Sequence, residues 1–539
     1  MTESTTIEET DAVVIVGAGP IGLGVSLELA LRGIRSIVLE SRAKDTHYAM
    51  RSNLTNLRSM EHFRRWGIAD RLRANDPIDP EFKRDVTWVT GLNGHVVVNF
   101  EGAFDFDQVP FAAEVPEWAP TTAIEKTMQD EAQTRTEIDL RFECEVTGVE
   151  QEADTVSVTY RQGAGELTLR APYLVAADGS RSPIRRQLGV KLEGTPDLVQ
   201  SSIWLIEAPD LIERSVVGRS SFYFFINEHR DAALMIVQDS DRGHYMFMVL
   251  PASEGADPAD WEATRQILYR NVGYEFPVKP LAGGHVRVHS MIAPRFDHGR
   301  VFLAGDAAHL ISPMGGFGMN IGIGDAVDLG WKLAATIQGW GGEKLLRSYG
   351  EERGEAVRWI QQECIDNTAI LAPELVEDGI SADAPSGDEV RARVAQRIIE
   401  EKTKEFISTG AQLGYRYTGS PIIVPNGQAP PLSMADYVPS ATPGCRAPHI
   451  WLKDGSSLYD HFGPGFTLLK LDRAVNTSAL EEAAATRGVP LKVLFVEEEQ
   501  MADLYGVNLA LVRPDQHIAW RGEAAPEDPL EVIDIVRGA

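Results

Sequence analysis

The sequence has few cysteines, no basic cluster and a strongly acidic balance. Its three cysteines, Cys144, Cys364 and Cys445, lie far apart and form no CxxC pair. This spacing argues against a disulfide framework, a zinc site and a dithiol redox centre. The net charge is −28, from 51 basic and 79 acidic residues. Nucleic acid and anionic membranes are therefore not expected as partners, because both attract basic surfaces.

No uninterrupted hydrophobic run is long enough to span a bilayer. The most apolar stretch, residues 12–31, is broken by glycines and a proline, and is better interpreted as a strand, a turn and a helix. The first residues, MTESTTIEETD, lack the basic and apolar segments of a secretory signal. We therefore expect a cytoplasmic protein. The length of 539 residues suggests three or four structural units.

Glycine is abundant where apolar strands end, and the first such place is near the N-terminus. Residues 12–16 are an uninterrupted apolar strand, followed by Gly17, Gly19 and Gly22 in the pattern GxGxxG. Gly17 permits a tight turn, Gly19 lets backbone N–H groups reach a pyrophosphate, and Gly22 brings the next helix close to the strand. The pattern predicts a dinucleotide site.

The residues that follow complete a βαβ unit. Residues 21–32 have helical spacing, and Ser36–Leu39 form a second strand closed by Glu40. A carboxylate at this position accepts hydrogen bonds from a ribose hydroxyl. Because NAD and FAD share the ADP half, this unit alone does not distinguish them.

Two later strands also end in an aspartate beside a glycine. Residues 173–177 lead into Asp178-Gly179, which taken alone is equally well a simple turn. Residues 301–304 lead into Gly305 and Asp306, at the strand end where open α/β sheets bind ligands. A carboxylate there can bind a polyol such as a ribityl chain.

A glycine-rich loop and a helix follow Asp306. Residues 313–318 can lie against a planar ring without intervening side chains, and residues 319–337 have a helical pattern. The start of that helix directs positive dipole at a ring that becomes anionic on reduction. FAD has both a ribityl chain and such a ring, whereas NAD has neither. The sequence therefore predicts FAD.

The order and spacing of the three motifs resemble the FAD-dependent aromatic hydroxylases, the class A flavoprotein monooxygenases. The segments VFLAGDAAHLISPMGGFGMN and AMRSNLTNLRSM carry the resemblance beyond the glycine turn. In the second segment Arg51 is a predicted flavin contact and Arg58 a second candidate. The motifs and the resemblance together predict the cofactor-binding residues Gly17, Gly19, Pro20, Gly22, Glu40, Ser41, Arg42, Arg51, Asp178, Gly305, Asp306, Pro313, Gly316, Gly318, Met319 and Asn320.

The resemblance implies an activity. NADH or NADPH would reduce FAD, O2 would give a flavin C4a-hydroperoxide, and that species would hydroxylate a phenolic ring. A Baeyer–Villiger monooxygenase acting on a polyketide-like substrate is the alternative, and a flavin-binding protein without turnover is a further one. The identity of the aromatic substrate and the choice between NADH and NADPH stay open. No metal is suggested.

The resemblance also implies the residues around the flavin ring. Pro313 would lie beside the C4a position as a wall and a backbone carbonyl, and Tyr223 is the candidate for activating the phenol. His289 and Arg295 are further candidates, whereas His309 is expected to be structural. The predicted substrate-contacting residues are Tyr223, Phe225, Met235, His289, Gly315 and Phe317.

Two positions depart from the family pattern. Thr121 and Phe317 each stand where glutamine is common in relatives.

The predicted architecture is α/β. Residues 1–75, 105–190 and 285–410 would form a Rossmann-type FAD-binding domain of the p-hydroxybenzoate-hydroxylase-like fold. Residues 76–104 and 191–284 would form an antiparallel-sheet substrate domain, whose strands would place Phe222 and Tyr223 on opposite faces. Residues 411–445 would be a linker, and 446–539 a thioredoxin-like domain without CxxC. By resemblance, the protein is expected to be a homodimer.

Overall fold

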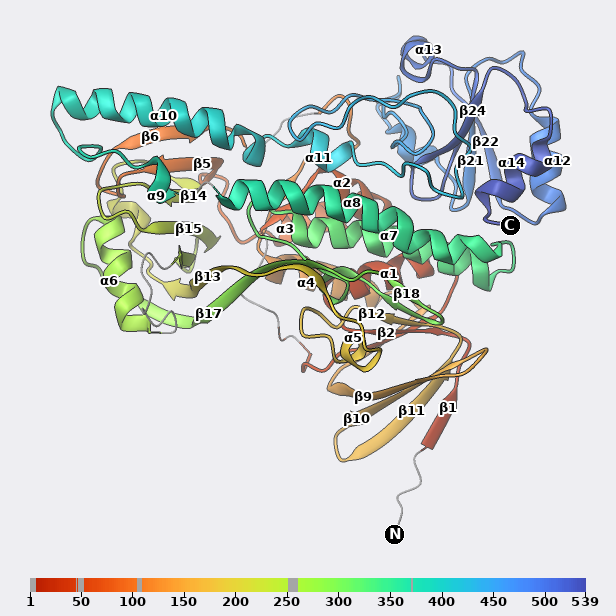
Figure 1. Cartoon of the computed structure of the whole chain (residues 1–539), viewed down its shortest axis with the longest axis horizontal. Coiled ribbons are helices and arrows are strands. Elements are labelled where there is room, and N and C mark those ends of the chain that lie inside the picture. The colour runs from red at the N-terminus through yellow and green to blue at the C-terminus, as the bar shows by residue number, and fades with distance from the viewer. Residues whose placement is uncertain (1–5, 45, 47–52, 104–108, 251–259, 370–371) are drawn as a thin grey trace.

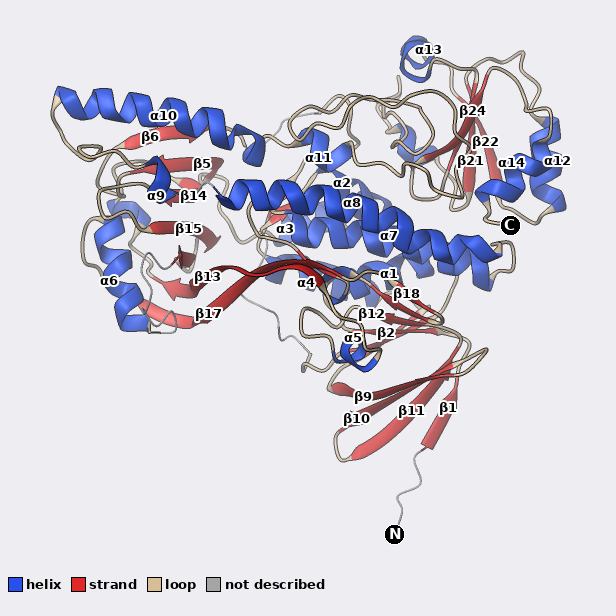
Figure 2. Ribbon diagram, in the orientation of Figure 1, coloured by secondary structure: helices blue, strands red, loops and turns tan. Residues whose placement is uncertain are grey.

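The computed structural model describes residues 6–44, 46, 53–103, 109–250, 260–369 and 372–539. Over these residues the chain forms a central parallel sheet with helices on one face, a large and mostly antiparallel sheet beside it, and a C-terminal α/β unit (Figures 1 and 2). No helix of the described part is both long and apolar enough to cross a membrane.

The central sheet is built from short apolar strands. Three of them lead into the glycine motifs: β2 (Val13–Val16), β12 (Leu174–Ala176) and β19 (Val301–Leu303). They are buried and pair in parallel as neighbours. In spatial order the strands are β18 (Asp297–His298), β19 (Val301–Leu303), β12 (Leu174–Ala176), β2 (Val13–Val16), β3 (Ser36–Leu39) and β8 (Ile138–Arg141). β18 alone among them is paired antiparallel.

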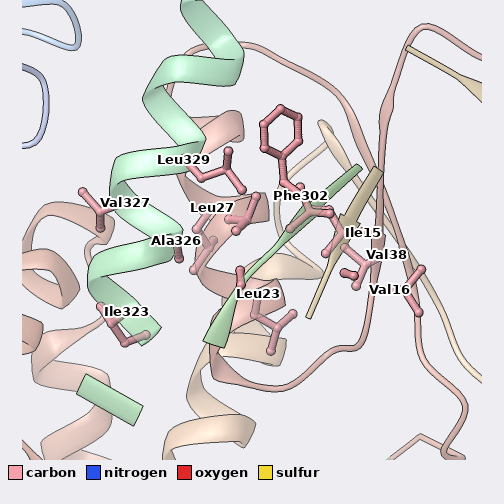
Figure 3. Close-up of a cluster of buried hydrophobic side chains, with 14 of the residues drawn as sticks. Ile15, Val16, Leu23, Leu27, Val38, Phe302, Ile323, Ala326, Val327 and Leu329 are labelled. Carbon is pink, nitrogen blue, oxygen red and sulfur yellow. The ribbon is translucent and has the colours of Figure 1, made fainter. Parts of the chain in front are cut away.

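Helix α1 (Pro20–Ala30) packs on this sheet, and helix α7 (Phe317–Ile337) packs on α1. Figure 3 shows Leu23 and Leu27 of α1 between the strand residue Ile15 and the α7 residue Ala326. The helices approach closely at glycine: a Cβ on Gly330 would lie 2.5 Å from the Cβ of Glu28. The tight crossing fixes the position of α7 relative to the sheet.

The other face of the central sheet is covered by a small sheet. Figure 1 shows it on the side opposite the helices. Its order is β1 (Thr6–Glu9), β11 (Gly165–Ala171), β10 (Val156–Gln162) and β9 (Cys144–Gln151). Within it, β10 and β11 form an antiparallel hairpin.

The large sheet has eight strands in the described part. Two of them, β13 (Glu193–Glu207) and β17 (Lys279–Ile292), are long and connect this sheet to the region of the central sheet (Figure 1). The order is β20 (His309–Leu310), β17 (Lys279–Ile292), β13 (Glu193–Glu207), β16 (His244–Leu250), β15 (Ala232–Asp239), β14 (Ser220–Phe225), β5 (Lys83–Val89) and β6 (Val96–Phe100).

Helices and short strands connect and cover the sheets. β4 (Leu54–Thr55) pairs with β7 (Glu117–Trp118) between the two large sheets. The remaining elements before the C-terminal unit are α2 (Leu57–Trp66), α3 (Ala69–Asn75), α4 (Thr121–Ala132), α5 (Pro183–Gln187), η1 (Ile212–Arg214), α6 (Trp261–Val272), η2 (Gly305–Ala307), α8 (Glu343–Ala369), α9 (Ala372–Leu375), α10 (Pro385–Phe406) and α11 (Thr409–Leu413).

The C-terminal unit is a four-stranded sheet with helices. Its strands in order are β22 (Leu491–Phe495), β21 (Phe466–Lys470), β23 (Leu509–Val512) and β24 (Ile518–Gly522). Its helices are η3 (Leu458–His461), α12 (Ser478–Thr486), α13 (Glu499–Tyr505) and α14 (Pro529–Val536). The mixed α/β architecture expected from sequence is confirmed.

Residues 372–390 are partly helical. The stretch 372–390 is rich in proline, glycine and aspartate, yet it contains α9 and the first turn of α10. Pro385 occupies the first turn of α10, where its missing N–H costs no hydrogen bond. The proline there starts a helix instead of breaking one.

Buried charges join the C-terminal unit to α7 and α8. Arg513 is 0% exposed in its side chain and bridges Asp328 at 2.9 Å, Glu352 at 2.6 Å and Asp515 at 2.6 Å. Lys332 of α7 contacts Asp328 and Glu352 at 2.8 and 2.6 Å. Burial alone would raise the pKa of Glu352, but Arg513 and Lys332 lower it to about 2. The Glu352 carboxylate is therefore ionised and paired.

Removing Arg513 would leave these carboxylates without their main cation. We expect Arg513→Ala to lower the free energy of unfolding by about 3–5 kcal/mol, as for a broken buried pair. Arg487→Ala, which removes an exposed pair with Asp534, should cost no more than about 1 kcal/mol. Urea unfolding measures both. Equal losses would show that the buried cluster does not hold the C-terminal unit.

Buried histidines predict loss of stability in acid. Burial lowers the pKa of His517 to about 4, with Asp515 opposing only part of that effect. Since an unfolded histidine titrates near pH 6.5, the unfolded state binds more protons between pH 6.5 and 4. Full stability is present above pH 6.5, and His517 alone removes about 1.4 kcal/mol per pH unit below it.

His517→Phe keeps a ring against Tyr417, which lies 4.4 Å away between ring centroids. We expect the stability difference between pH 7 and pH 5 to be smaller in this variant by about 2 kcal/mol. Chemical denaturation at both pH values measures this. An unchanged difference would show that His517 is not held neutral.

Candidate cofactor and substrate site

The three glycine motifs meet at one edge of the central sheet. β19, β12 and β2 are adjacent and parallel, so their carboxyl ends lie side by side. Gly17 follows β2 directly, and Asp178 and Gly305 each follow their strand after one alanine. Residues separated by almost 300 positions in sequence are thus brought to one crevice edge, where open α/β sheets bind ligands.

The first glycine turn is closed at two positions and open at the third. A Cβ on Gly17 would lie 2.4 Å from the carbonyl oxygen of Ala177, and one on Gly22 would lie 1.9 Å from that of Gly17. Around Gly19, by contrast, no described atom lies within 4 Å of the Cβ position. Gly19 caps α1 without a side-chain hydrogen bond, and Pro20 begins the helix. The turn therefore has space and positive dipole for a phosphate.

Glu40 holds this turn in place. Its Oε2 accepts a 2.8 Å hydrogen bond from the Ala18 N–H, and its Oε1 accepts from the N–H and Nε of Arg42 at 2.9 and 3.0 Å. Burial would raise the pKa of Glu40, but the bonds from Arg42 and Ala18 lower it overall. Arg42 also reaches Glu125 at 3.2 Å. Ser41 lies beside the carboxylate, with its hydroxyl 3.4 Å from Oε1.

Asp178 has one carboxylate oxygen to offer. Its Oδ2 accepts from the N–H of Ile184 at 3.2 Å, whereas its Oδ1 is buried and has no hydrogen-bond partner among the described residues. Burial raises its pKa. The Cα of Asp178 is 3.4 Å from the Cβ position on Gly17. A ligand hydroxyl beside the turn would satisfy the orphaned oxygen.

The third motif is held by Asp325 of α7. This carboxylate accepts from the Gly305 N–H at 3.0 Å, lies 2.7 Å from the His309 Nε2 and accepts from the Arg353 Nε at 2.8 Å. Burial would raise the pKa of Asp325, but His309 and Arg353 lower it. His309 is 1% exposed and occupied by this bond, which agrees with the structural role expected for it.

The sequence reasoning missed Asp325 and Arg353. Both are 0% exposed, and the available signal was a pair of acids, Asp325 and Asp328, inside an otherwise apolar helix. Buried acids need partners, so their presence predicts a network.

Gly305 itself has φ +59°, and a Cβ there would lie 2.7 Å from Ile21 of α1. Asp306 follows at the strand end and is half-buried.

The glycine-rich loop opens at the start of α7. Gly315 and Gly316 have φ +107° and +71°, and Gly316 caps α7 without a side-chain hydrogen bond. No described atom lies within 4 Å of the Cβ position on Gly318. The first turn of α7 contains no acid, so its dipole is not neutralised there. The loop and helix start suit a flat ring that carries negative charge.

Asn320 fixes the start of α7 to the β4 segment. Its Nδ2 donates to Leu54 O at 2.8 Å and to Gly316 O at 2.7 Å, and its Oδ1 accepts from the Asn56 N–H at 2.9 Å. The side chain is therefore fully used in shaping the loop. Met319, next to it, is half-exposed.

Pro313 lies exposed at the start of the loop. Its carbonyl oxygen accepts from the Gly316 N–H at 3.0 Å, which makes residues 313–316 a turn. Phe317 is 2% exposed and packs in the core around the central sheet, close behind Gly315. Gly315 is half-exposed.

The two arginines expected near the flavin have different outcomes. Arg51 lies outside the described residues. Arg58 points to the C-terminal unit: its Nη2 donates to Asp515 O at 2.6 Å and its Nη1 to the Gln516 Oε1 at 2.5 Å. It also pairs with Glu61 at 2.9 Å. Arg58 thus has a structural place at an interface instead of a flavin contact.

The eight-stranded sheet has two unlike faces. One face is fully packed, with exposed fractions between 0% and 1% for Tyr223, Phe225, Met235, Val237, Tyr245 and Phe247. The other, which we name the open face, keeps small exposed fractions; it consists of Phe222, Phe224, Leu234, Ile236, Met246 and Met248. Phe222 is half-exposed.

The open face is directed toward the glycine-rich loop. Phe222 contacts Trp118 of β7, with ring centroids 6.0 Å apart. Trp118 pairs with Leu54, which lies 3.3 Å from the Cβ position on Gly316. Phe224 stacks on Trp88 at 4.4 Å. Aromatic surface and the start of α7 therefore border the same region.

The predicted substrate-contacting residues are divided by this geometry. Tyr223, Phe225 and Met235 lie on the packed face, and the Tyr223 hydroxyl donates to Gly218 O at 2.8 Å and accepts from the Ser220 N–H at 2.7 Å. His289 lies in β17, where its Nδ1 accepts a hydrogen bond from the N–H of Asp197 in β13 at 3.0 Å.

Arg295 is exposed and pairs with Asp297 at 2.9 Å. Gly315 and Phe317 belong to the loop. The structure thus gathers the cofactor motifs in one place, and it separates the candidate phenol-activating groups from the open face.

The sequence and the fold match known proteins over most of the chain. A family model described as "FAD binding domain" matches residues 9–363, and one described as "Aromatic-ring hydroxylase, C-terminal" matches residues 440–534.

Named relatives agree with these matches. FAD-dependent monooxygenase apdD of Emericella nidulans is 31% identical over 95% of this chain and 87% of its own length. Aklavinone 12-hydroxylase RdmE of Streptomyces purpurascens is 30% identical over 97% of both chains. The structure of the rebeccamycin biosynthetic enzyme RebC with reduced flavin is similar at a TM-score of 0.89, with 32% identity, covering 99% of this chain and 100% of that one.

The glycine turn gives a paired test of cofactor binding. Gly19→Ala adds a methyl group where the protein leaves space, so folding should be nearly unchanged, while affinity for FAD should fall by about tenfold or more through contact with the pyrophosphate. Gly22→Ala meets backbone 1.9 Å away and should destabilise the protein itself. Flavin fluorescence and thermal unfolding separate the two effects. Unchanged FAD affinity in Gly19→Ala would contradict the assignment of the turn.

Proposed function

Because this chain belongs to the family of FAD-dependent aromatic-ring hydroxylases, we propose that it hydroxylates a fused-ring phenol with O2 and NAD(P)H. Bound FAD supplies the chemistry that accepts a hydride and activates O2 for transfer of one oxygen atom to the ring. The relatives named for aklavinone hydroxylation support a polycyclic substrate.

The observation that carries the proposal is the open face. Its six side chains are apolar, two of them are stacked phenylalanines 4.6 Å apart, and Trp88 extends the stack. Flat aromatic surfaces bind planar rings by offset stacking and by exclusion of water. Phe222 is the half-exposed member of this face, and the stacked rings behind it extend from β14 to β5, which suits fused rings better than a single phenol.

The residues around the motifs fit FAD. The orphaned Oδ1 of Asp178 and the open positions at Gly19 and Gly318 lie along the path from the α1 turn to the start of α7. We assign Gly17, Gly19, Pro20 and Gly22 to the pyrophosphate, and the residues following β3, β12 and β19 to the sugar and ribityl groups. The start of α7 faces the ring and stabilises negative charge on it.

The protein's own part in the reaction is positional. The 313–316 turn forms one wall, the open face forms the opposite wall, and both exclude water from the reacting atoms. Pro313 contributes its ring to the loop wall, while its carbonyl oxygen is engaged within the turn. Since Tyr223 is enclosed in the packed face, we do not assign proton transfer to it.

A test uses purified enzyme with FAD, NADPH and a series of phenols of increasing ring number. We expect 1-naphthol and hydroxyanthraquinones to stimulate NADPH oxidation more than phenol or 4-hydroxybenzoate does. With ¹⁸O2, the product should gain one labelled oxygen atom. Lactone products would instead indicate the Baeyer–Villiger alternative, and NADPH oxidation without labelled product would contradict hydroxylation.

We also propose that the enzyme acts in the cytoplasm and forms a homodimer. The cytoplasmic assignment is supported by the requirement for NAD(P)H and by the three cysteines, which are all buried as unpaired thiols. The dimer rests on the family resemblance alone. Light scattering of the FAD-loaded protein would measure its mass in solution.

The two faces of β14 give a test of the substrate wall. Phe222→Ala should raise KM for the best polycyclic substrate by about tenfold, because it removes a half-exposed ring from the open face. Tyr223→Phe, one residue away on the packed face, should keep KM and kcat within about twofold while losing about 1 kcal/mol of stability. Loss of hydroxylation in a folded Tyr223→Phe variant would make this tyrosine the phenol-activating group.

A further inference from the structure

Asn367, near the end of α8, has a buried amide without a hydrogen-bond partner in the part of the chain that the structure describes. The residue is 2% exposed, and neither Oδ1 nor Nδ2 of its side chain has a hydrogen-bond partner among the described residues. Leaving a buried donor or acceptor unsatisfied costs about 1–3 kcal/mol. Most buried amides in native proteins are paired, so an exception of this kind needs a reason.

The position of Asn367 is fixed from two sides. Its backbone carbonyl accepts from the Lys402 Nζ of α10 at 2.8 Å. The hydroxyl of the next residue, Thr368, lies 2.7 Å from that of Ser312, immediately before the glycine-rich loop. The end of α8 is thus clamped between α10 and the loop, and the amide cannot leave this place without breaking those bonds.

The amide lies directly beside the loop. Its Nδ2 is 3.7 Å from the Cβ position on Gly315. Met314, the preceding residue, packs in the same apolar cluster as Phe222, Phe224 and Phe406 of the substrate sheet and α10. The unpartnered amide therefore adjoins the boundary between the loop and the open face, where the neighbouring surface is apolar.

From this geometry we infer that Asn367 is a substrate-positioning residue. Its amide hydrogen-bonds an oxygen substituent of the aromatic substrate: Oδ1 accepts from a hydroxyl, or Nδ2 donates to a phenolate or carbonyl oxygen. The glycines at 315 and 316 allow the loop to adjust as the bond forms. The inference rests on the proposed function, since it requires an aromatic ligand between the loop and the open face.

The first test is stability. In Asn367→Leu an apolar side chain of similar size replaces an unpartnered amide, so the thermal midpoint should be unchanged or higher. The matched control is Asn271→Leu. The Asn271 amide is also buried, but it donates to Asp231 and to Ile267 O at 2.8 and 2.9 Å and accepts from Asn227 at 3.1 Å. The control should unfold at a lower temperature.

The second test is ligand affinity in the FAD-loaded enzyme. 1-Naphthol and naphthalene are titrated while the flavin absorbance spectrum is recorded, in wild type, Asn367→Leu and Asn367→Ala. We expect the affinity for 1-naphthol to fall by about tenfold in both variants, because one hydrogen bond is lost. The affinity for naphthalene, which has no oxygen, should change by less than about twofold, and that for FAD should be unchanged.

Several results would overturn the inference. Equal losses for 1-naphthol and naphthalene would indicate an effect of shape alone, and a loss of FAD affinity would make Asn367 a cofactor contact. A lower thermal midpoint in Asn367→Leu, like that of Asn271→Leu, would make it a structural residue. If FAD binds but neither aromatic compound binds the wild-type enzyme, the proposed function itself fails, which is distinct from a failure at Asn367.

Discussion

The carboxylate of Asp325 is the contact on which the geometry of the site depends. It joins the backbone of Gly305, the ring of His309 and the guanidinium of Arg353, all within 3.0 Å. Through these bonds one buried group sets the strand end, the segment leading to the glycine-rich loop, and the pairing of α7 with α8. Because the group is buried, its full pairing is required, and any rearrangement would leave a charge without a partner.

The same helix carries three tasks along its length. Its start, which has no side-chain cap, adjoins the glycine loop, and its middle holds Asp325. Its second half presents Asp328 to Arg513 of the C-terminal unit, and Lys332 pairs with the same carboxylate. The C-terminal unit therefore contacts α7 through buried ion pairs and through the rings of Trp331 and Phe466, which lie 6.1 Å apart. These contacts fix the position of the C-terminal unit on α7.

The sequence predicted the parts of this site that depend on local constraint. Gly17 and Gly22 have no room for a side chain, so the identity and spacing of these glycines are enough to indicate the turn. The sequence did not predict which face of β14 borders the glycine-rich loop. Alternation placed Phe222 and Tyr223 on opposite sides, but both sides are apolar, and which one packs against neighbouring segments is decided by tertiary contacts. Arg58 shows the same limit, since its partners Asp515 and Gln516 are over 450 positions away.

Among the buried carboxylates and side-chain amides of the described residues, hydrogen bonding separates those that build this protein from those that await a ligand. Asn320 and Asn271 use their amides fully, and Asp325 uses both oxygens, so each has its reason within the fold. Asp178 and Asn367, by contrast, keep buried polar atoms that have no partner among the described residues. Both lie beside glycine turns, one at each end of the region assigned to FAD. A fold that satisfies most of its buried charges elsewhere tolerates such atoms where binding energy can repay their desolvation, and this is the physical basis for assigning them to ligands.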